Sequence, residues 1–224
     1  MINTVIFDMD GTVMNTLDDL TDAVNYVLGE FGMPFRKQDE YRRFFGNGIR
    51  FALECAVPKD TPAEMIDKML PVFKDYYNKH CLDKTSPYCG ILPLMKSLKE
   101  KGYKMAIVSN KIDSAVAELN DRFFSEYVNV AVGERQGIKR KPAADMVIAA
   151  LDELKSTCEE SIYVGDSEVD LETAQNAGLP CIAVLWGFRD KEFLIENGAE
   201  YFAEKPDDVE RIISKINDPA INEF

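Results

Sequence analysis

The residues from 4 to 16 constrain the fold of this chain most. They begin with a short apolar run, Val5-Ile6-Phe7, whose β-branched and aromatic residues are typical of a strand buried on both faces. Asp8 and Asp10 end this run, and because side chains alternate along extended backbone, both acids leave the strand on the same side. Ligands of open parallel α/β sheets bind at this place, beyond the carboxyl end of a strand.

Two carboxylates this close together raise each other's free energy, so a chain seldom places them at a strand end unless a cation or a proton transfer uses them. Gly11 gives the backbone the freedom to turn sharply after the strand, and the hydroxyl of Thr12 can fix that turn by bonding to nearby backbone. The pattern therefore predicts an acidic site built on a tight turn.

Charge and hydropathy exclude several classes of partner. The 224 residues carry a formal net charge of −13, which argues against nucleic acid or an anionic membrane surface. No stretch approaches the ~18 consecutive apolar residues of a membrane span. An anionic substrate would need local cations, either a bound metal or a few placed basic side chains.

Cysteine and histidine usage argues against zinc. The five cysteines are scattered without a C-x-x-C pair, and His80 is the only histidine. Free thiols suit a reducing compartment, and the N-terminus has neither the basic region nor the long apolar run of a signal peptide. We expect a cytoplasmic protein.

A helical segment interrupts the chain after the first strand. Apolar residues at helical spacing begin at Leu17, where Thr16 and Asp19 form an acidic variant of a capping box. Thr61-Pro62-Ala63-Glu64 reads as a helix start with Thr at the N-cap, and Pro71 is expected to kink or break that helix. Helices are predicted at 17–31, 38–45, 49–57 and about 61–81. We therefore predict an all-α insertion at 16–86 within an α/β domain made of 1–15 and 87–224.

Strands alternate with helices in the second part of the chain. Strands are predicted at 103–108, 128–132, 162–164, 181–185 and 201–202, and the last of these is expected to complete the chain. Strand–helix alternation gives a parallel sheet with right-handed crossovers. The expected fold class is α/β, a doubly wound parallel sheet with a helical cap.

The ends of the later strands carry polar residues that suit a phosphate site. Ser109 and Asn110 offer neutral donors, and Lys141 offers a positive charge near a helix start. Asp166 and Asp170 both face one site if the first closes a strand and the second lies in the first helical turn. No single one of these features is specific, but their order along the chain is.

This order resembles the four motifs of the haloacid dehalogenase superfamily, in particular its phosphatases with a small helical cap of the phosphoglycolate phosphatase type. The matching segments are Asp8-x-Asp10-Gly11-Thr12, Ser109-Asn110, Lys141-Pro142 and Gly165-Asp166-Ser167-x-x-Asp170. Trp186-Gly187-Phe188-Arg189 is similar to the segment that follows the fifth strand in that family. The resemblance covers nearly the whole chain.

The resemblance implies a Mg²⁺-dependent phosphatase. Asp8 would attack phosphorus and form an aspartyl-phosphate, and Asp10 would protonate the leaving oxygen and then activate water. Ser109 and Lys141 would orient the transferring group. Mg²⁺ would be held by the Asp8 carboxylate, the Asp10 backbone carbonyl and Asp166, with Asp170 supporting these ligands, because a few hard oxygen ligands suit this ion. Thr12 and Asn110 are further candidate substrate contacts.

The substrate is predicted only as a class, a small phosphorylated metabolite. The loop Gly46-Asn47-Gly48-Ile49-Arg50 resembles the cap loop of phosphoglycolate phosphatases, so Gly46, Asn47 and Arg50 are candidate contacts to the leaving group. Phosphosugar mutases, pyrophosphatases and nucleotidases share the same core and stay open, as does the choice between monomer and homodimer.

Three other readings fit less well. A halide-removing enzyme of this fold does not need the acid at Asp10. A receiver-like phosphorylation switch has no insertion after its first strand, and its phosphorylated aspartate lies on a later strand. A P-loop kinase is disfavoured because the chain has no P-loop pattern.

Overall fold

The computed structural model describes residues 1–218 and 220, which divide into two compact units. The core unit comprises Met1–Val13 and Pro87–Phe224, and the helical unit comprises Met14–Ser86. The short strands β2 (Met14–Asn15) and β3 (Ser86–Pro87) pair with each other where the chain passes between the units. Each unit is described by itself.

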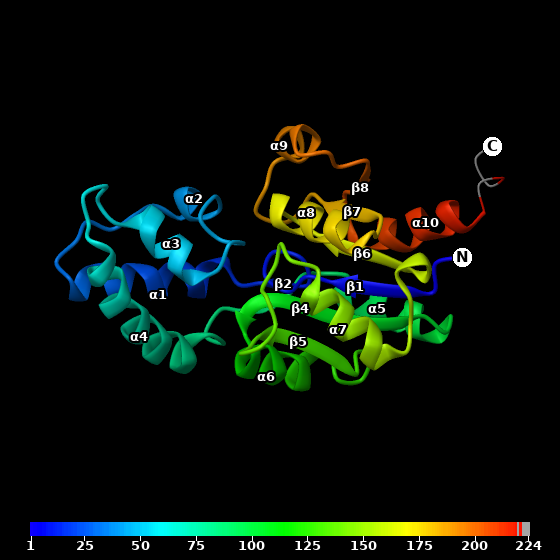
Figure 1. The fold of residues 1–224 in the computed structure, drawn as a ribbon, viewed down its shortest axis with the longest axis horizontal. Helices are drawn as coiled ribbons and strands as arrows, with labels where there is room; N and C mark the ends of the chain where they lie inside the picture. Colours follow the sequence, from blue (N-terminus) through cyan, green and yellow to red (C-terminus); the bar gives the residue numbers. More distant parts are fainter. Residues whose placement is uncertain (219, 221–224) are drawn as a thin grey trace. The chain divides into compact units, whose positions relative to one another are not determined.

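The core unit is built on a parallel sheet of six strands in the order β5-β4-β1-β6-β7-β8 (Figure 1). Neighbouring strands pair in parallel, with Phe7 of β1 opposite Ile107 of β4 on one side and Val164 of β6 on the other. From β1 the chain proceeds outward through β4 and β5, then returns to the other side of β1 for β6, β7 and β8. This reversal beside β1 is the topological switch point, where an open α/β sheet binds its ligands.

The sheet is apolar on both faces, which explains the continuous hydrophobic runs of its strands. Ile6, Ala106 and Tyr163 face a buried cluster that includes residues of α7 and α8. Their neighbours Val5 and Phe7 point the other way and are also fully buried. The core strands are β1 (Thr4–Phe7), β4 (Lys104–Ile112), β5 (Val130–Glu134), β6 (Ser161–Gly165), β7 (Cys181–Val184) and β8 (Tyr201–Ala203).

The core helices alternate with these strands, so the predicted α/β fold class is confirmed. They are α5 (Ile91–Glu100), α6 (Asp113–Phe123), α7 (Asp145–Leu154), α8 (Glu168–Ala177), α9 (Lys191–Glu196) and α10 (Pro206–Asn217), with a short 3₁₀ turn at Cys158–Glu160. The expectation that the strand near Tyr201 completes the chain is wrong. Helix α10 follows it and buries Val209 and Ile213, which lie on one helical face.

The helical unit contains α1 (Leu17–Glu30), α2 (Gln38–Tyr41), α3 (Ile49–Ala56) and α4 (Ala63–His80). Helix α4 starts after Pro62 rather than at a Thr61 cap, and it continues through Pro71. Buried side chains on both sides of Pro71, among them Met69 and Phe73, hold the helix together although the proline lacks an N–H. No helix in the described part of the chain has the length and apolar character needed to cross a bilayer.

The predicted capping box at the start of α1 is also wrong. The Thr16 side chain makes no capping hydrogen bond. Asp19 instead accepts hydrogen bonds from the backbone amides of Lys84 and Thr85, at 3.0 and 2.9 Å. These amides lie more than sixty residues along the chain, so the carboxylate ties the two ends of the helical unit together rather than the end of one helix.

Candidate active site

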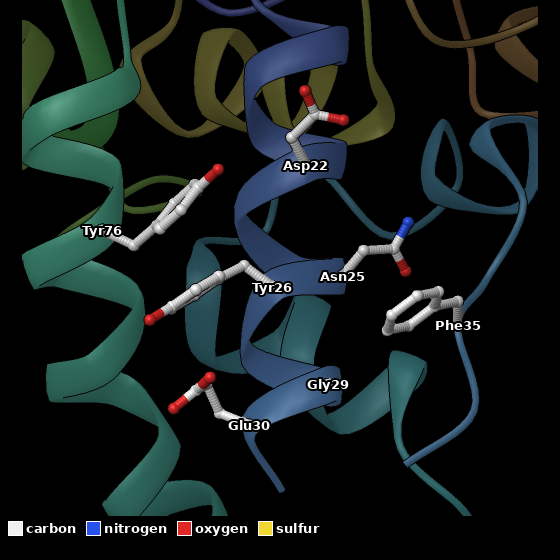
Figure 2. Close-up of a pocket in the computed structure, with 7 residues that line it drawn as sticks. All are labelled: Asp22, Asn25, Tyr26, Gly29, Glu30, Phe35 and Tyr76. Atoms are coloured by element: carbon white, nitrogen blue, oxygen red, sulfur yellow. The ribbon is translucent and has the colours of Figure 1, made fainter. Parts of the chain in front are cut away.

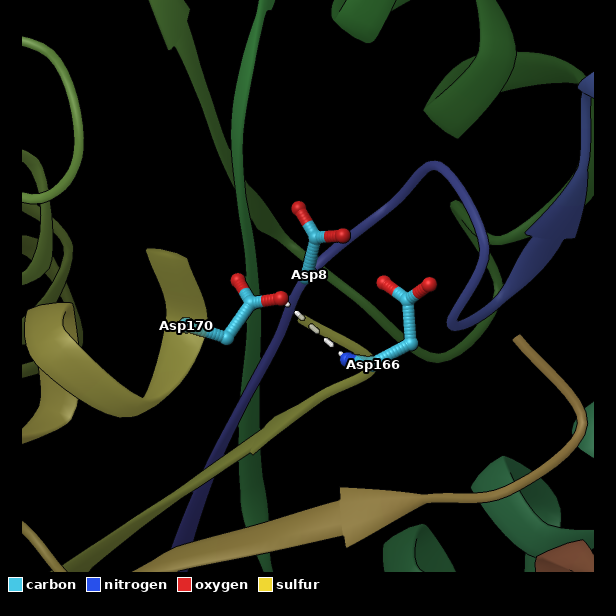
Figure 3. A group of neighbouring side chains, drawn as sticks. All are labelled: Asp8, Asp166 and Asp170. Carbon is cyan, nitrogen blue, oxygen red and sulfur yellow. Dashed lines mark hydrogen bonds between the residues drawn. The ribbon is translucent and has the colours of Figure 1, made fainter. Parts of the chain in front are cut away.

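Three buried carboxylates meet at the switch point of the sheet (Figure 3). Asp8 follows β1, Asp166 follows β6, and Asp170 lies in the first turn of α8. Each offers an oxygen within 4.8 Å of the oxygens of the other two. The strand ends position Asp8 and Asp166, and the helix start turns Asp170 back toward them.

Lys141 lies among these acids. Its Nζ is 2.5 Å from Asp8 Oδ1 and 2.8 Å from Asp170 Oδ1, and its side chain is only 3% exposed. It also donates a hydrogen bond to the hydroxyl of Tyr163, at 3.1 Å. Burial alone would lower the pKa of Lys141, but the carboxylates of Asp170 and Asp8 outweigh burial and hold this pKa well above its ordinary value. The ammonium is therefore charged at neutral pH.

Asp170 is saturated with hydrogen bonds. Its Oδ2 accepts from the backbone amides of Asp166 and Ser167 and from the Ser167 hydroxyl, at 3.2, 3.1 and 2.7 Å. Its Oδ1 accepts from Lys141 and Tyr163. These contacts cap α8 and fix Asp170 in one orientation, so its main effect is to position Lys141 and the backbone of Asp166.

The Asp166 carboxylate accepts fewer hydrogen bonds than that of Asp170, and it lies close to the backbone of two glycines. The amide of Phe188 donates to its Oδ2 at 2.6 Å, and the Thr12 hydroxyl lies 3.4 Å from its Oδ1. A Cβ at Gly11, whose φ is +90°, or at Gly187 would collide with the Asp166 side chain. Burial raises the pKa of Asp166 to about 7, and the charge of Asp170 adds to this shift.

The charges of this cluster fit a divalent cation. Asp8, Asp166 and Asp170 bring three carboxylates, whereas the Lys141 ammonium pairs with two of them, Asp8 and Asp170. Buried carboxylates in excess over cations are unfavourable unless they bind protons or a metal. Hard oxygen ligands such as these carboxylates suit Mg²⁺, which retains several waters in such sites.

A second ion pair lies at the edge of the same strand ends. Lys111 Nζ is 2.9 and 3.1 Å from the two oxygens of Asp10. The backbone amide of Lys111 donates to Ser109 Oγ at 3.2 Å, and Asn110 donates to the carbonyl of Lys141 at 3.0 Å. Lys111 thus links Asp10 and Ser109, whereas Asn110 contacts the backbone of Lys141.

The candidate residues of the helical unit are placed differently. Gly46 and Asn47 lie in the loop before α3, and Arg50 lies in the first turn of that helix. Arg50 pairs with Glu54 at 3.2 Å and with Asp67, both within the helical unit. A hollow of about 380 Å³ between α1 and α4 is lined by other residues, including Tyr26, Phe35 and Tyr76 (Figure 2).

Several site residues are not singled out by their sequence pattern. Tyr163 reads as an ordinary apolar strand residue, and only the structure shows its hydroxyl beside Lys141. Phe188 acts through its backbone amide, which no side-chain pattern reveals. Lys111 does leave a signal, because it directly follows the polar pair Ser109-Asn110 at the end of a predicted strand.

Comparison with known proteins finds relatives that match most of the chain. Residues 5–184 match the family model of the haloacid dehalogenase-like hydrolases. A phosphoglycolate phosphatase of Aquifex aeolicus is 30% identical over 185 residues, 82% of this chain and 85% of the relative. The pyrophosphatase PpaX of Listeria monocytogenes is 29% identical and covers 95% of this chain and 96% of its own. The crystal structure of a candidate phosphoglycolate phosphatase from Lactobacillus delbrueckii superposes with a TM-score of 0.90 at 36% identity, covering 94% of this chain and 98% of that one.

Proposed function

Because the chain belongs to the haloacid dehalogenase-like hydrolase family and is a phosphatase, we propose that it hydrolyses small phosphomonoesters with Mg²⁺ through an aspartyl-phosphate. The observation that carries this proposal is the position of Asp8. Its carboxylate lies at the switch point, 2.5 Å from the Lys141 ammonium and next to Asp166 and Asp170. This arrangement holds a nucleophile and a cation together where a phosphate would bind.

In the first half of the reaction, an Asp8 oxygen forms a bond to phosphorus while the bond to the leaving oxygen breaks. Asp10 gives its proton to that oxygen. In the second half, Asp10 takes a proton from water, the water oxygen attacks phosphorus, and Asp8 is released together with inorganic phosphate. Lys141 and Ser109 bind the oxygens of the transferring group throughout, with Thr12 and Asn110 supporting the site.

The metal would be held by the carboxylates of Asp8 and Asp166 and by the backbone carbonyl of Asp10. Asp170 would orient this set through the hydrogen bonds described above. When bound, Mg²⁺ supplies positive charge that neutralises the phosphate oxygens. The residues of the chain bind, orient and move protons.

The substrate proposed first is phosphoglycolate, because relatives that match most of this chain carry that activity in their names. The similarity to pyrophosphatase PpaX over 95% of the chain makes pyrophosphate the second candidate. Contacts from Gly46, Asn47 and Arg50 to the leaving group are part of the same proposal. We place the reaction in the cytoplasm, in a monomer or a homodimer.

The test is phosphate release from phosphoglycolate, pyrophosphate, a hexose phosphate and a nucleoside monophosphate, each with Mg²⁺ and with EDTA. We expect release that requires Mg²⁺ and is fastest with phosphoglycolate. Full turnover in EDTA would contradict the requirement for Mg²⁺. Absence of phosphate release from all four compounds would contradict the proposal that the substrates are small phosphorylated metabolites.

A further inference from the structure

A short substrate such as phosphoglycolate carries a second anion, so its site needs a second cation. The need for this second cation rests on the proposed function. Lys141 is already held by Asp8, Asp170 and Tyr163. Arg189, another buried cation near these strand ends, is held by both oxygens of Glu168, at 2.7 and 2.9 Å. Among the buried cations near these strand ends, Lys111 is the one that pairs with the proposed general acid, Asp10.

Lys111 lies where it could bind the second anion of such a substrate. It lies on β4, two residues after Ser109, in a stretch where the register with β5 shifts between Val108 and Ile112, and its amide donates a hydrogen bond to Ser109 Oγ at 3.2 Å. Its side chain is only 6% exposed, although lysine is rarely buried unless it is paired. The partner is Asp10, whose own side chain is 19% exposed. The ammonium is thus drawn inward to the residue that serves the leaving oxygen.

Distances connect Lys111 to the leaving group. If Asp10 gives its proton to the leaving oxygen, that oxygen lies within a hydrogen bond of about 3 Å from the Asp10 carboxyl. Lys111 Nζ lies 2.9 Å from the same carboxyl. The Lys111–Asp10 distance and the Asp10–leaving-oxygen hydrogen bond together place the ammonium no more than about 6 Å from the leaving oxygen. In phosphoglycolate a single methylene separates the ester oxygen from the carboxylate, which spans this gap.

We propose that Lys111 binds the carboxylate of the leaving group and thereby makes the core unit itself selective for short anionic phosphomonoesters. An ammonium is a compact point charge and suits a carboxylate that approaches from one side. The substrate carboxylate would join Asp10 as an acceptor at Lys111. Selection of the leaving group then begins within the core unit, on the strand that also supplies Ser109.

Arg50 is the competing cation. Its guanidinium is 39% exposed and pairs with Glu54 and Asp67 inside the helical unit. A substrate carboxylate would have to compete with two acids that are already bound there. Lys111 instead pairs with Asp10, the residue proposed to give its proton to the leaving oxygen.

The experiment compares phosphoglycolate with 2-hydroxyethyl phosphate, a neutral ester of similar length. Each variant is compared with the wild type on the same ester, so the intrinsic reactivities of the two esters cancel. The variants are Lys111→Met, which keeps the aliphatic stem, Lys111→Arg, which restores a cation, and Arg50→Ala. Lys96→Met, on the exposed face of α5, controls for the loss of one positive charge. Thermal unfolding and inhibition by inorganic phosphate check the fold and the phosphate site.

We expect Lys111→Met to lower kcat/KM for phosphoglycolate about 10- to 150-fold, the range of a lost hydrogen bond to a charged group. For the neutral ester we expect less than about threefold, and Lys111→Arg should recover part of the loss. Inhibition by inorganic phosphate should stay as in the wild type.

An equal loss on both esters would overturn the proposal, because Lys111 would then act only by positioning Asp10. A selective loss in Arg50→Ala with none in Lys111→Met would overturn it in favour of the helical unit. A wild type that hydrolyses neither ester would instead refute the proposed function, and the inference with it.

Discussion

Removing the Lys141 ammonium while keeping its stem tests how the site holds its charges. Lys141→Met leaves Asp8 and Asp170 buried without the cation that now lies 2.5 and 2.8 Å from them. Breaking a buried ion pair by removing one partner costs about 3–5 kcal/mol. For a domain of this length each kcal/mol lowers Tm by about 2–4 °C, so Tm should fall by about 6–20 °C at pH 7.5 in EDTA.

The stability difference between the wild type and Lys141→Met should depend on pH in a defined direction. In the wild type the raised pKa of Lys141 keeps its contribution complete at all pH values below the ordinary lysine value. Burial raises the pKa of Asp8 and the nearby Lys141 ammonium lowers it, so without this cation Asp8 binds a proton more readily. The difference in unfolding free energy between wild type and variant should therefore be small at pH 5 and grow as the pH rises to 8.

The assay is denaturant unfolding of the wild type and Lys141→Met at pH 5 and pH 8. Lys139→Met is the matched control, because Lys139 is exposed two residues away. A Lys141→Met protein as stable as the Lys139→Met protein at pH 8 would refute the reasoning, since the buried acids would then not depend on this cation.

Two further predictions concern the metal. Because the pKa of Asp166 is raised to about 7, proton binding stabilises the folded, metal-free protein at low pH, and this stability is lost as pH rises from about 4 toward 7. Mg²⁺ binds the ionised carboxylate, so addition of Mg²⁺ should raise the Tm of the protein more at pH 8 than at pH 6. A rise in Tm that is independent of pH would contradict the role of Asp166 as a ligand. Gly187→Ala should push the Asp166 side chain aside, cost about 1–3 kcal/mol of stability and weaken Mg²⁺ binding measured by calorimetry. Unchanged Mg²⁺ affinity in this variant would show that Asp166 does not hold the ion.

The sequence predicts the sheet and the acids of the core unit because both depend on local patterns. Apolar runs ending in polar residues give the strands, and strand alternation places Asp8 beyond the end of β1. Parallel strands bring their carboxyl ends to one edge, which is why Asp8 and Asp166 meet although they lie far apart in the chain.

The failures have a common physical cause, which is competition from contacts distant in sequence. Asp19 bonds to the amides of Lys84 and Thr85 instead of capping α1, and no local pattern reveals those partners. Helix α4 continues through Pro71 because packing outweighs the local cost of the proline. The missed helix α10 did carry a signal, an amphipathic run with Pro206 at its first turn.

The most direct test of the account is the detection of a phosphoryl group on Asp8 during turnover. The protein is mixed with para-nitrophenyl phosphate and Mg²⁺, quenched in acid, and the peptide that contains Asp8 is analysed by mass spectrometry. Asp10→Asn should accumulate the intermediate, because this leaving group needs no acid whereas the attacking water still needs a base. We predict a Mg²⁺-dependent phosphoryl group on Asp8 in that variant and none when Asp8 is replaced by Asn. Phosphate release without any phosphorylated protein, or with the label on another residue, would contradict the central claim.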